Sequence, residues 1–253
     1  MKRLLFLALA ITLLIKDTLS LPTPSETTST YEVNEIEHGA VASVSPASPA
    51  ATESESLSSR KRVSALAFKR YTNLLLFQLE RTHHIAKDVL ADPTITALSS
   101  EQMHGKIEIL RKYVTQSDLA ELKKVPPAKI PNRYYLAIGT IFVLGHFDSV
   151  VRELNATSEQ DKSRSENLLW AALQRHGLQE YLVEVEKRGI ELFESCVDDF
   201  EKYVKSLSSA ERENDEVARR YVMYTQHPER LSKREFAGQL LDVILRDAAK
   251  AYE

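Results

Sequence analysis

Cysteine is almost absent from this chain: Cys196 is the only one among 253 residues. One cysteine cannot form an internal disulfide bond, so the fold must rest on its apolar core. Cys196 falls within an apolar helical pattern, which predicts a buried thiol, with an intermolecular disulfide as the alternative. A catalytic thiol would need a histidine in an electropositive pocket, and no signature of such an enzyme surrounds Cys196.

An excess of charge is also absent. The chain has 33 Lys and Arg residues against 36 Asp and Glu residues, which gives a formal net charge of −3. Proteins that bind nucleic acids present an excess of basic side chains to the phosphates. The composition therefore predicts that nucleic acid is not a partner.

The common enzyme motifs are missing as well. The sequence has no P-loop, no dinucleotide-binding glycine pattern, no His-Glu-x-x-His and no nucleophile elbow. Glu80, His84 and Asp88 are spaced by four residues, so on a helix they would share one face that could hold a metal ion. No second cluster of matching spacing accompanies them, and a solvated helix face is the better interpretation. We therefore predict a protein that is not an enzyme, with no catalytic residues, no metal and no cofactor.

Residues 1–20 have the three parts of a secretory signal peptide. A short basic region, Met1-Lys2-Arg3, precedes an apolar block over 4–15, and Ser20 ends a stretch of small residues suited to cleavage. The apolar block is too short for a membrane anchor. We expect a secreted protein whose mature chain begins near Leu21.

Residues 21–62 differ in composition from the rest of the chain. They are dense in Ser, Thr, Pro, Ala and Glu and contain one aromatic residue, Tyr31. Such a segment buries too little apolar surface to offset its chain entropy, so we predict disorder. It ends in Arg60-Lys61-Arg62, which on extended, exposed backbone is typical of a proprotein cleavage site. A basic flank without processing is the alternative.

Residues 63–253 show the apolar periodicity of helices joined by short loops. The first helix should run from Ser64 to Ala91 and stop at Asp92-Pro93. Further helices are expected at 99–114, 116–124, 132–154, 168–174, 178–207, 208–227 and from 232 onward. Four of these helices have the sequence of a capping box near their start, at Ser99/Gln102, Ser163/Glu166, Ser208/Glu211 and Ser232/Glu235. The prediction is one all-α domain, a bundle of about seven helices.

The most apolar part of this domain is 134–154. Its first twelve residues are apolar or glycine except for Thr140. A buried strand over 138–143 is an alternative, but no other convincing strand is present to pair with it. The unbroken apolar run is shorter than the roughly 20 residues that a membrane span needs. We therefore predict that the helix 132–154 lies at the centre of the bundle.

Apolar residues in the helix 178–207 alternate spacings of four and three, with a stutter after Cys196. This seam could be buried within the domain or could pair with a second copy. The stutter and the many other helices favour burial, so we expect a monomer.

Asn155-Ala156-Thr157 is the only N-glycosylation sequon in the chain. It falls in an expected loop, where a glycan on Asn155 would be accessible.

The overall plan consists of a signal peptide, a Ser/Thr-rich segment ending in Arg60-Lys61-Arg62 and a cysteine-poor helical domain. It resembles secreted effector precursors of filamentous plant pathogens, in layout alone: the RxLR and dEER motifs of one such group are absent, and Arg60-Lys61-Arg62-Val63 does not match the first. The resemblance implies a non-enzymatic virulence protein that acts on a host protein. A domain without disulfides would withstand the reducing interior of a host cell.

A carrier of an apolar ligand such as a fatty acid, held between the helices, is the alternative function. An unfilled cavity lined by Ile141, Phe142, Leu144 and the helix of Trp170 would favour the carrier, whereas tight packing would favour the interaction protein.

Overall fold

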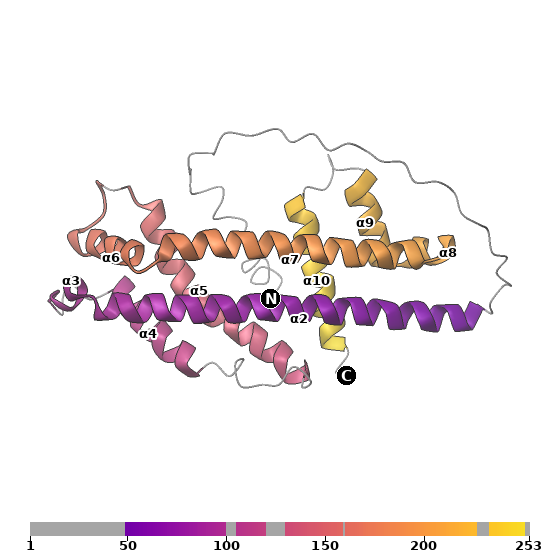
Figure 1. The fold of residues 1–253 in the computed structure, drawn as a ribbon, viewed down its shortest axis with the longest axis horizontal. Helices are drawn as coiled ribbons and strands as arrows, with labels where there is room; N and C mark the ends of the chain where they lie inside the picture. Colours follow the sequence, from indigo (N-terminus) through magenta and orange to yellow (C-terminus); the bar gives the residue numbers. More distant parts are fainter. Residues whose placement is uncertain (1–48, 100–104, 120–129, 159, 227–232, 251–253) are drawn as a thin grey trace.

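The computed structural model describes residues 49–99, 105–119, 130–158, 160–226 and 233–250 (Figure 1). These residues form nine helices and no strands, which confirms the all-α prediction. The helices are α2 (Pro49–Ala91), α3 (Pro93–Thr96), α4 (Lys106–Leu119), α5 (Ile130–Ala156), α6 (Arg164–Arg175), α7 (Leu178–Ser206), α8 (Ser209–Asn214), α9 (Glu216–Gln226) and α10 (Lys233–Lys250). The predicted signal peptide with Ser20, and the segment 21–48, lie outside the described residues.

Helix α2 is the centre of the described fold. It has 43 residues, runs beside the 29-residue α7, and contacts α3, α4, α5, α6, α7 and α10 (Figure 1). The helix predicted over 132–154 exists as α5, which contacts α2, α4, α6 and α10 and contributes to both apolar clusters of the core. The neighbouring helices cover only part of the surface of α5: Leu144 is buried, whereas Phe142 is 53% exposed.

The start of α2 also differs from the prediction. The helix begins at Pro49, so residues 49–62 are helical where disorder was predicted, and the expected domain boundary at residue 63 falls inside α2. Proline is well suited to the first position of a helix, and Ala50 and Ala51 follow it without a helix breaker before residue 63. The composition of this segment indicated disorder because composition does not reveal contacts with distant parts of the chain. Arg60 makes such contacts, with Asp215 and Asp247.

Two apolar clusters make up the core. The first joins α2, α5, α7, α9 and α10 around Phe200 and Phe236, and the second joins the other end of α2 to α4, α5, α6 and α7 around Tyr113 and Phe147. Helix α5 contributes to both clusters because it crosses obliquely from one to the other (Figure 1). Cys196 lies in the first cluster and is 4% exposed, so the predicted burial of the thiol is confirmed.

The apolar seam of α7 is buried within the chain. Its inward positions include Leu182, Val185, Phe200 and Tyr203, and α7 packs against α2 along much of its length. The seam is thus not available as a coiled-coil surface. The monomeric state stays a prediction.

Several helix termini follow the sequence signals, and others differ from them. The capping boxes Ser163/Glu166 and Ser208/Glu211 are both formed. Gly177 has a φ of 93°, a left-handed conformation that favours glycine, and it separates α6 from α7. The helix expected over 208–227 is instead broken at Asp215, whose backbone is extended. Helices expected at 99–114 and 116–124 are replaced in the described part by the single α4, and Gln102 and Ser232 lie outside the described residues.

Candidate interaction surface

An apolar surface on α5 faces solvent. Tyr135 is 73% exposed and Phe142 is 53% exposed, and both lie on one side of the helix about two turns apart. Gly139 lies between them, and a Cβ atom built on Gly139 meets nothing within 4 Å. We call Tyr135, Gly139 and Phe142 the outer face of α5. It consists of two projecting rings on either side of an open position.

The opposite side of α5 holds the helix in place. Ala137 and Leu144 are buried in the first cluster, and α5 contacts α2 and α10 there. Thr140 is 3% exposed, and its hydroxyl donates a hydrogen bond of 2.8 Å to the carbonyl oxygen of Leu136. The outer face therefore lies opposite the buried side of α5, and its side chains are not part of the core.

By length and composition, the stretch Tyr135–Ala156 of α5 could cross a membrane, with a mean hydropathy of 1.2. Only 28% of its most apolar window is buried, which agrees with the exposure of the outer face. This stretch of 22 residues is longer than the unbroken apolar run in its sequence, which alone is too short for a membrane span. One helix of this kind does not identify a membrane protein, because core helices of compact domains pass the same test. No other helix in the described part of the chain passes it.

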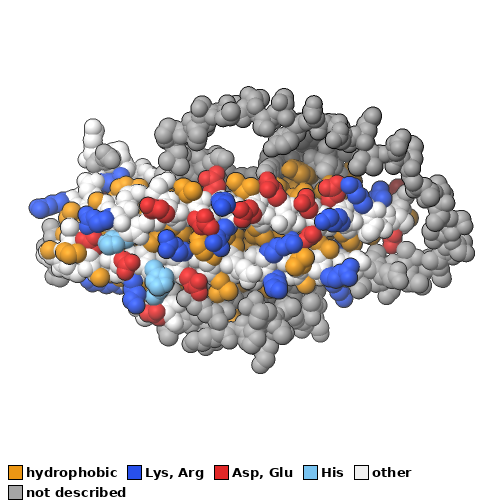
Figure 2. All heavy atoms as spheres, in the orientation of Figure 1, with side chains coloured by type: hydrophobic (Ala, Val, Ile, Leu, Met, Phe, Trp, Pro, Cys, Tyr) orange, Lys and Arg blue, Asp and Glu red, His pale blue; other side chains and the backbone are white. Residues whose placement is uncertain are grey.

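The face formed by α2 and α7 has a different character. Figure 2 shows Lys and Arg side chains interspersed with Asp and Glu along both helices, with no gathering of one sign on that face. Some of these charges pair within one helix, as Glu184 does with Arg188 and Glu201 with Lys205. Exposed pairs of this kind add little free energy, so this face is a solvated surface.

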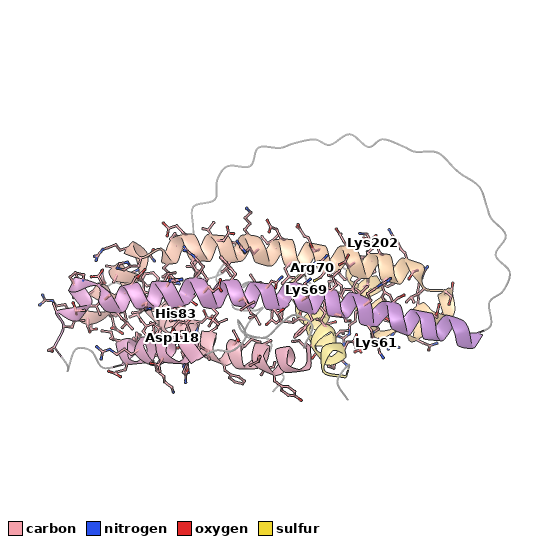
Figure 3. The ribbon with its side chains drawn as sticks, turned by 60° about the horizontal axis from the view of Figure 1, so that its bottom comes forward. Lys61, Lys69, Arg70, His83, Asp118 and Lys202 are labelled. Atoms are coloured by element: carbon pink, nitrogen blue, oxygen red, sulfur yellow. The ribbon has the colours of Figure 1, made fainter. Side chains whose placement is uncertain are left out.

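A serine, a histidine and an aspartate meet between α2 and α4. The Nδ1 of His83 lies 2.7 Å from the Oγ of Ser117, and its Nε2 lies 3.2 Å from an oxygen of Asp118 (Figure 3). In a hydrolase triad the serine reaches substrate and the aspartate is buried. Here the burial is reversed, because Ser117 is 4% exposed and the side chain of Asp118 is 62% exposed. The Ser117 hydroxyl also donates to the carbonyl oxygen of Val114 at 3.0 Å, so the cluster joins two helices.

Asp92 forms a second polar cluster where α2 ends. Its carboxylate accepts hydrogen bonds from the backbone N–H and the hydroxyl of Thr94, at 2.8 and 2.6 Å, and pairs with Arg175 at 2.6 Å and His176 at 2.8 Å. The hydrogen bonds from Thr94, followed by those from His176 and Arg175, hold the pKa of Asp92 well below its usual range. Asp92 thus caps α3 and ties the end of α2 to the end of α6.

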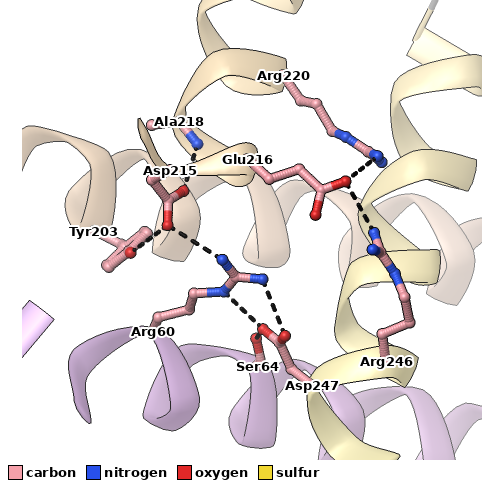
Figure 4. A network of polar contacts seen from close by, with 9 residues as sticks. All are labelled: Arg60, Ser64, Tyr203, Asp215, Glu216, Ala218, Arg220, Arg246 and Asp247. Carbon is pink, nitrogen blue, oxygen red and sulfur yellow. Dashed lines mark hydrogen bonds and ion pairs between the residues drawn. The ribbon is translucent and has the colours of Figure 1, made fainter. Parts of the chain in front are cut away.

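A third polar cluster surrounds Arg60 (Figure 4). The guanidinium donates from Nε and Nη2 to the two carboxylate oxygens of Asp247, at 2.9 and 3.0 Å, and from Nη1 to Asp215 at 3.2 Å. Ser64 donates to Asp247 at 2.8 Å, and the Tyr203 hydroxyl donates to Asp215 at 2.9 Å. We call these five residues the Arg60 clasp. It connects α2 to α10 and to the junction of α8 and α9.

The clasp changes the interpretation of the basic triplet. Arg60-Lys61-Arg62 lies inside α2, so the extended backbone predicted for it is wrong. The side chain of Arg60 is 23% exposed, whereas Lys61 and Arg62 are exposed. Cleavage at the triplet stays a prediction.

Asn155 also differs from expectation. It lies in the last turn of α5, where a loop was predicted. Thr157 of the sequon remains tied to that turn, because its hydroxyl donates a 2.8 Å hydrogen bond to the carbonyl oxygen of Glu153. Glycosylation of Asn155 stays a prediction.

Cys196 and the trio Glu80, His84 and Asp88 are the remaining candidate site residues, and neither forms a reactive or metal-binding site in the described residues. Burial raises the pKa of Cys196 to about 11, so its thiol is protonated at neutral pH. Glu80, His84 and Asp88 are exposed on α2. Within the described residues, no three His, Cys, Asp or Glu side chains form a group that could hold a metal ion.

The residues expected to line a ligand cavity lie in different surroundings, although Ile141 and Leu144 both belong to or pack against the first cluster. Leu144 is buried in the first cluster, whereas Phe142 faces solvent. Trp170 packs against the second cluster, with the ammonium group of Lys162 5.7 Å from its ring centroid. The carrier function stays a prediction.

Sequence reasoning missed the roles of His83, Asp92, Asp148 and the partners of Arg60. Asp148 is half-buried on α5, and burial raises its pKa to about 7, with Arg152 opposing the shift. Only Asp92 carried a local signal, because an aspartate before Pro93 is a typical N-cap. The contacts of His83 with Ser117 and of Arg60 with Asp215 and Asp247 join distant parts of the chain and leave no pattern in the sequence.

Comparison with protein-family models, with curated proteins and with solved structures finds no match for this chain. Its function must therefore be argued from its own residues.

Proposed function

We propose that this protein is a non-enzymatic interaction protein that engages a partner protein through the outer face of α5. The observation that carries the proposal is the exposure of two aromatic rings on either side of an open glycine. Single exposed apolar residues are common on protein surfaces, but Tyr135 and Phe142 occupy the most apolar helix of the fold. Aromatic side chains supply much of the binding energy of protein interfaces.

The shape of the outer face favours a helix as the contacting element of the partner. Tyr135 and Phe142 flank Gly139 on the same side of α5, which leaves a shallow hole between two knobs. A partner helix can place a side chain in such a hole and pack its neighbours against the rings. The expected secretion further suggests a partner outside the producing cell, as in the virulence effectors whose layout this chain resembles.

Three polar clusters support a non-enzymatic role. The His83, Asp92 and Arg60 clusters each connect separate helices, and their polar atoms are used in those connections. Stabilisation of the fold accounts for each cluster, and none of them needs a substrate to explain its polar atoms.

Photo-crosslinking tests the proposal. A photoreactive phenylalanine analogue is placed at Phe142 or, as a control, at Met223, which is 48% exposed on α9. The proposal predicts a discrete protein adduct from position 142 and none from position 223. Equal adducts from both positions would contradict it, and so would lipid as the only adduct from position 142.

Gly139→Leu sharpens this test. A Cβ atom at position 139 meets nothing within 4 Å, and leucine has a higher helix propensity than glycine, so we expect folding to be unaffected or stabilised by up to about 1 kcal/mol. The adduct from position 142 should disappear in this variant while its thermal stability is retained. Persistence of the adduct would show that the crosslink does not report docking at the outer face.

A further inference from the structure

The Arg60 clasp lies on the residues that a protease specific for basic sites would recognise. Lys61 and Arg62 are exposed, so the side chains that such an enzyme reads are accessible. Their backbone is helical, however, and proteases bind their substrates on extended, exposed backbone. Cleavage after Arg62 therefore requires the first part of α2 to unwind locally.

Unwinding α2 through Arg62 would break the clasp. Arg60 makes two parallel hydrogen bonds to Asp247 on α10 and a third to Asp215 between α8 and α9. Each bond joins charged groups at a partly buried site, where such bonds are stronger than exposed ones. The free energy of local opening at this site thus depends on residues more than 150 positions away.

We propose that the Arg60 clasp is a lock on a proteolytic site. While the clasp is closed, Arg60-Lys61-Arg62 stays helical and uncut. When it opens, a protease specific for basic residues adds water across the Arg62–Val63 peptide bond, which leaves a carboxylate on Arg62 and an amine on Val63. This lock is independent of the partner proposed for α5.

Cleavage would also remove the lock itself. The fragment ending at Arg62 carries Arg60 away, so Asp215 and Asp247 lose their shared guanidinium. The contact between Ser64 and Asp247 remains, but α10 and the junction of α8 and α9 are no longer joined through one cation. The cut form should therefore melt at a lower temperature than the intact form.

Limited proteolysis of the full chain tests the lock. Asp247→Asn and Asp215→Asn open the clasp without changing the triplet, and the amide at position 215 can still cap α9, as the carboxylate does through the N–H of Ala218. The matched control is Asp242→Asn, which removes an exposed ion pair with Arg246 on the same helix. The protein is treated with dilute trypsin, and the fragment that begins at Val63 is quantified by mass spectrometry.

The lock predicts that Asp247→Asn forms this fragment at least tenfold faster than the wild type. Asp215→Asn should have a smaller effect because it removes one of the three hydrogen bonds, and Asp242→Asn should have none. Cleavage at Lys187-Arg188 within α7 reports global unfolding and should not change. Unchanged cleavage after Arg62, or an equal increase at Lys187-Arg188, would overturn the proposal.

Discussion

Arg60 and Asp247 are 187 positions apart in the chain and meet through two parallel hydrogen bonds of 2.9 and 3.0 Å. This pair joins the first long helix to the last one. It also extends the domain upstream of Val63, because Arg60 is part of the folded structure.

Removing the guanidinium should destabilise the domain. We expect Arg60→Gln to lower the free energy of unfolding by roughly 1–3 kcal/mol, since two partly buried carboxylates lose their cation. Arg60→Lys should recover only part of this loss, because an ammonium group cannot bind Asp247 with two parallel hydrogen bonds. Urea unfolding measures both variants, and an unchanged midpoint for Arg60→Gln would contradict the role of the clasp.

Asp148 should make stability fall as the pH rises. Its pKa is about 7 in the folded protein and near 3.8 when unfolded, so between these values the unfolded chain releases its proton first. The contribution of Asp148 to the free energy of unfolding should therefore be fully present below about pH 4 and should be lost as the pH rises to about 7. Arg152 opposes this shift in the pKa of Asp148, and the charge of Asp148 in turn contributes to the raised pKa of Tyr113 and Tyr181.

Asp148→Asn removes this dependence. The variant should be more stable than the wild type at pH 8, by roughly 1–4 kcal/mol, and should lose the advantage near pH 4. Thermal melts across this range provide the measurement, with Asp88→Asn on the exposed side of α2 as the control. Parallel curves for wild type and Asp148→Asn would show that the Asp148 carboxyl is solvated.

Asp92 should act in the opposite direction. Its pKa is lowered in the folded state, so its contribution is present above the unfolded value near 3.8 and is lost as the pH falls below it. Asp92→Ala should cost roughly 2–4 kcal/mol at pH 7, because Arg175 and His176 lose their partner and α3 loses its cap. Denaturation at pH 7 and pH 3 should show a smaller difference between variant and wild type at pH 3.

The two sides of α5 should respond differently to truncation. Phe147 is fully buried between Tyr113 and Tyr181, so Phe147→Ala should cost about 3–5 kcal/mol. Phe142→Ala on the outer face should change stability by no more than about 0.5 kcal/mol. Similar losses in the two variants would mean that the outer face is covered.

The helices could be predicted from the sequence because their signals are local. The capping boxes at Ser163 and Ser208 depend on residues within a few positions, and those predictions are confirmed. The many neighbours of α2 could not be predicted in the same way. An all-round apolar helix resembles a buried one in sequence, whereas the central position of α2 follows from its length and its many neighbours.

The same distinction applies to the candidate sites. Arg60-Lys61-Arg62 was recognisable as a basic triplet, but its helical state depends on Asp215 and Asp247 far along the chain. The outer face of α5 was hidden within an apolar run whose buried and exposed sides look alike. Contacts between distant parts of the chain determine both the helical state of the triplet and which side of α5 is exposed.

Hydrogen–deuterium exchange of the full chain tests most directly whether the folded domain includes Arg60. Amides of residues 60–66 should exchange slowly in the wild type, like those farther along α2, because they belong to a helix held by the clasp. In Asp247→Asn the same amides should exchange at least tenfold faster, while those around Phe147 remain protected. Rapid exchange at residues 60–62 in the wild type, with protection beginning only after Val63, would contradict the account.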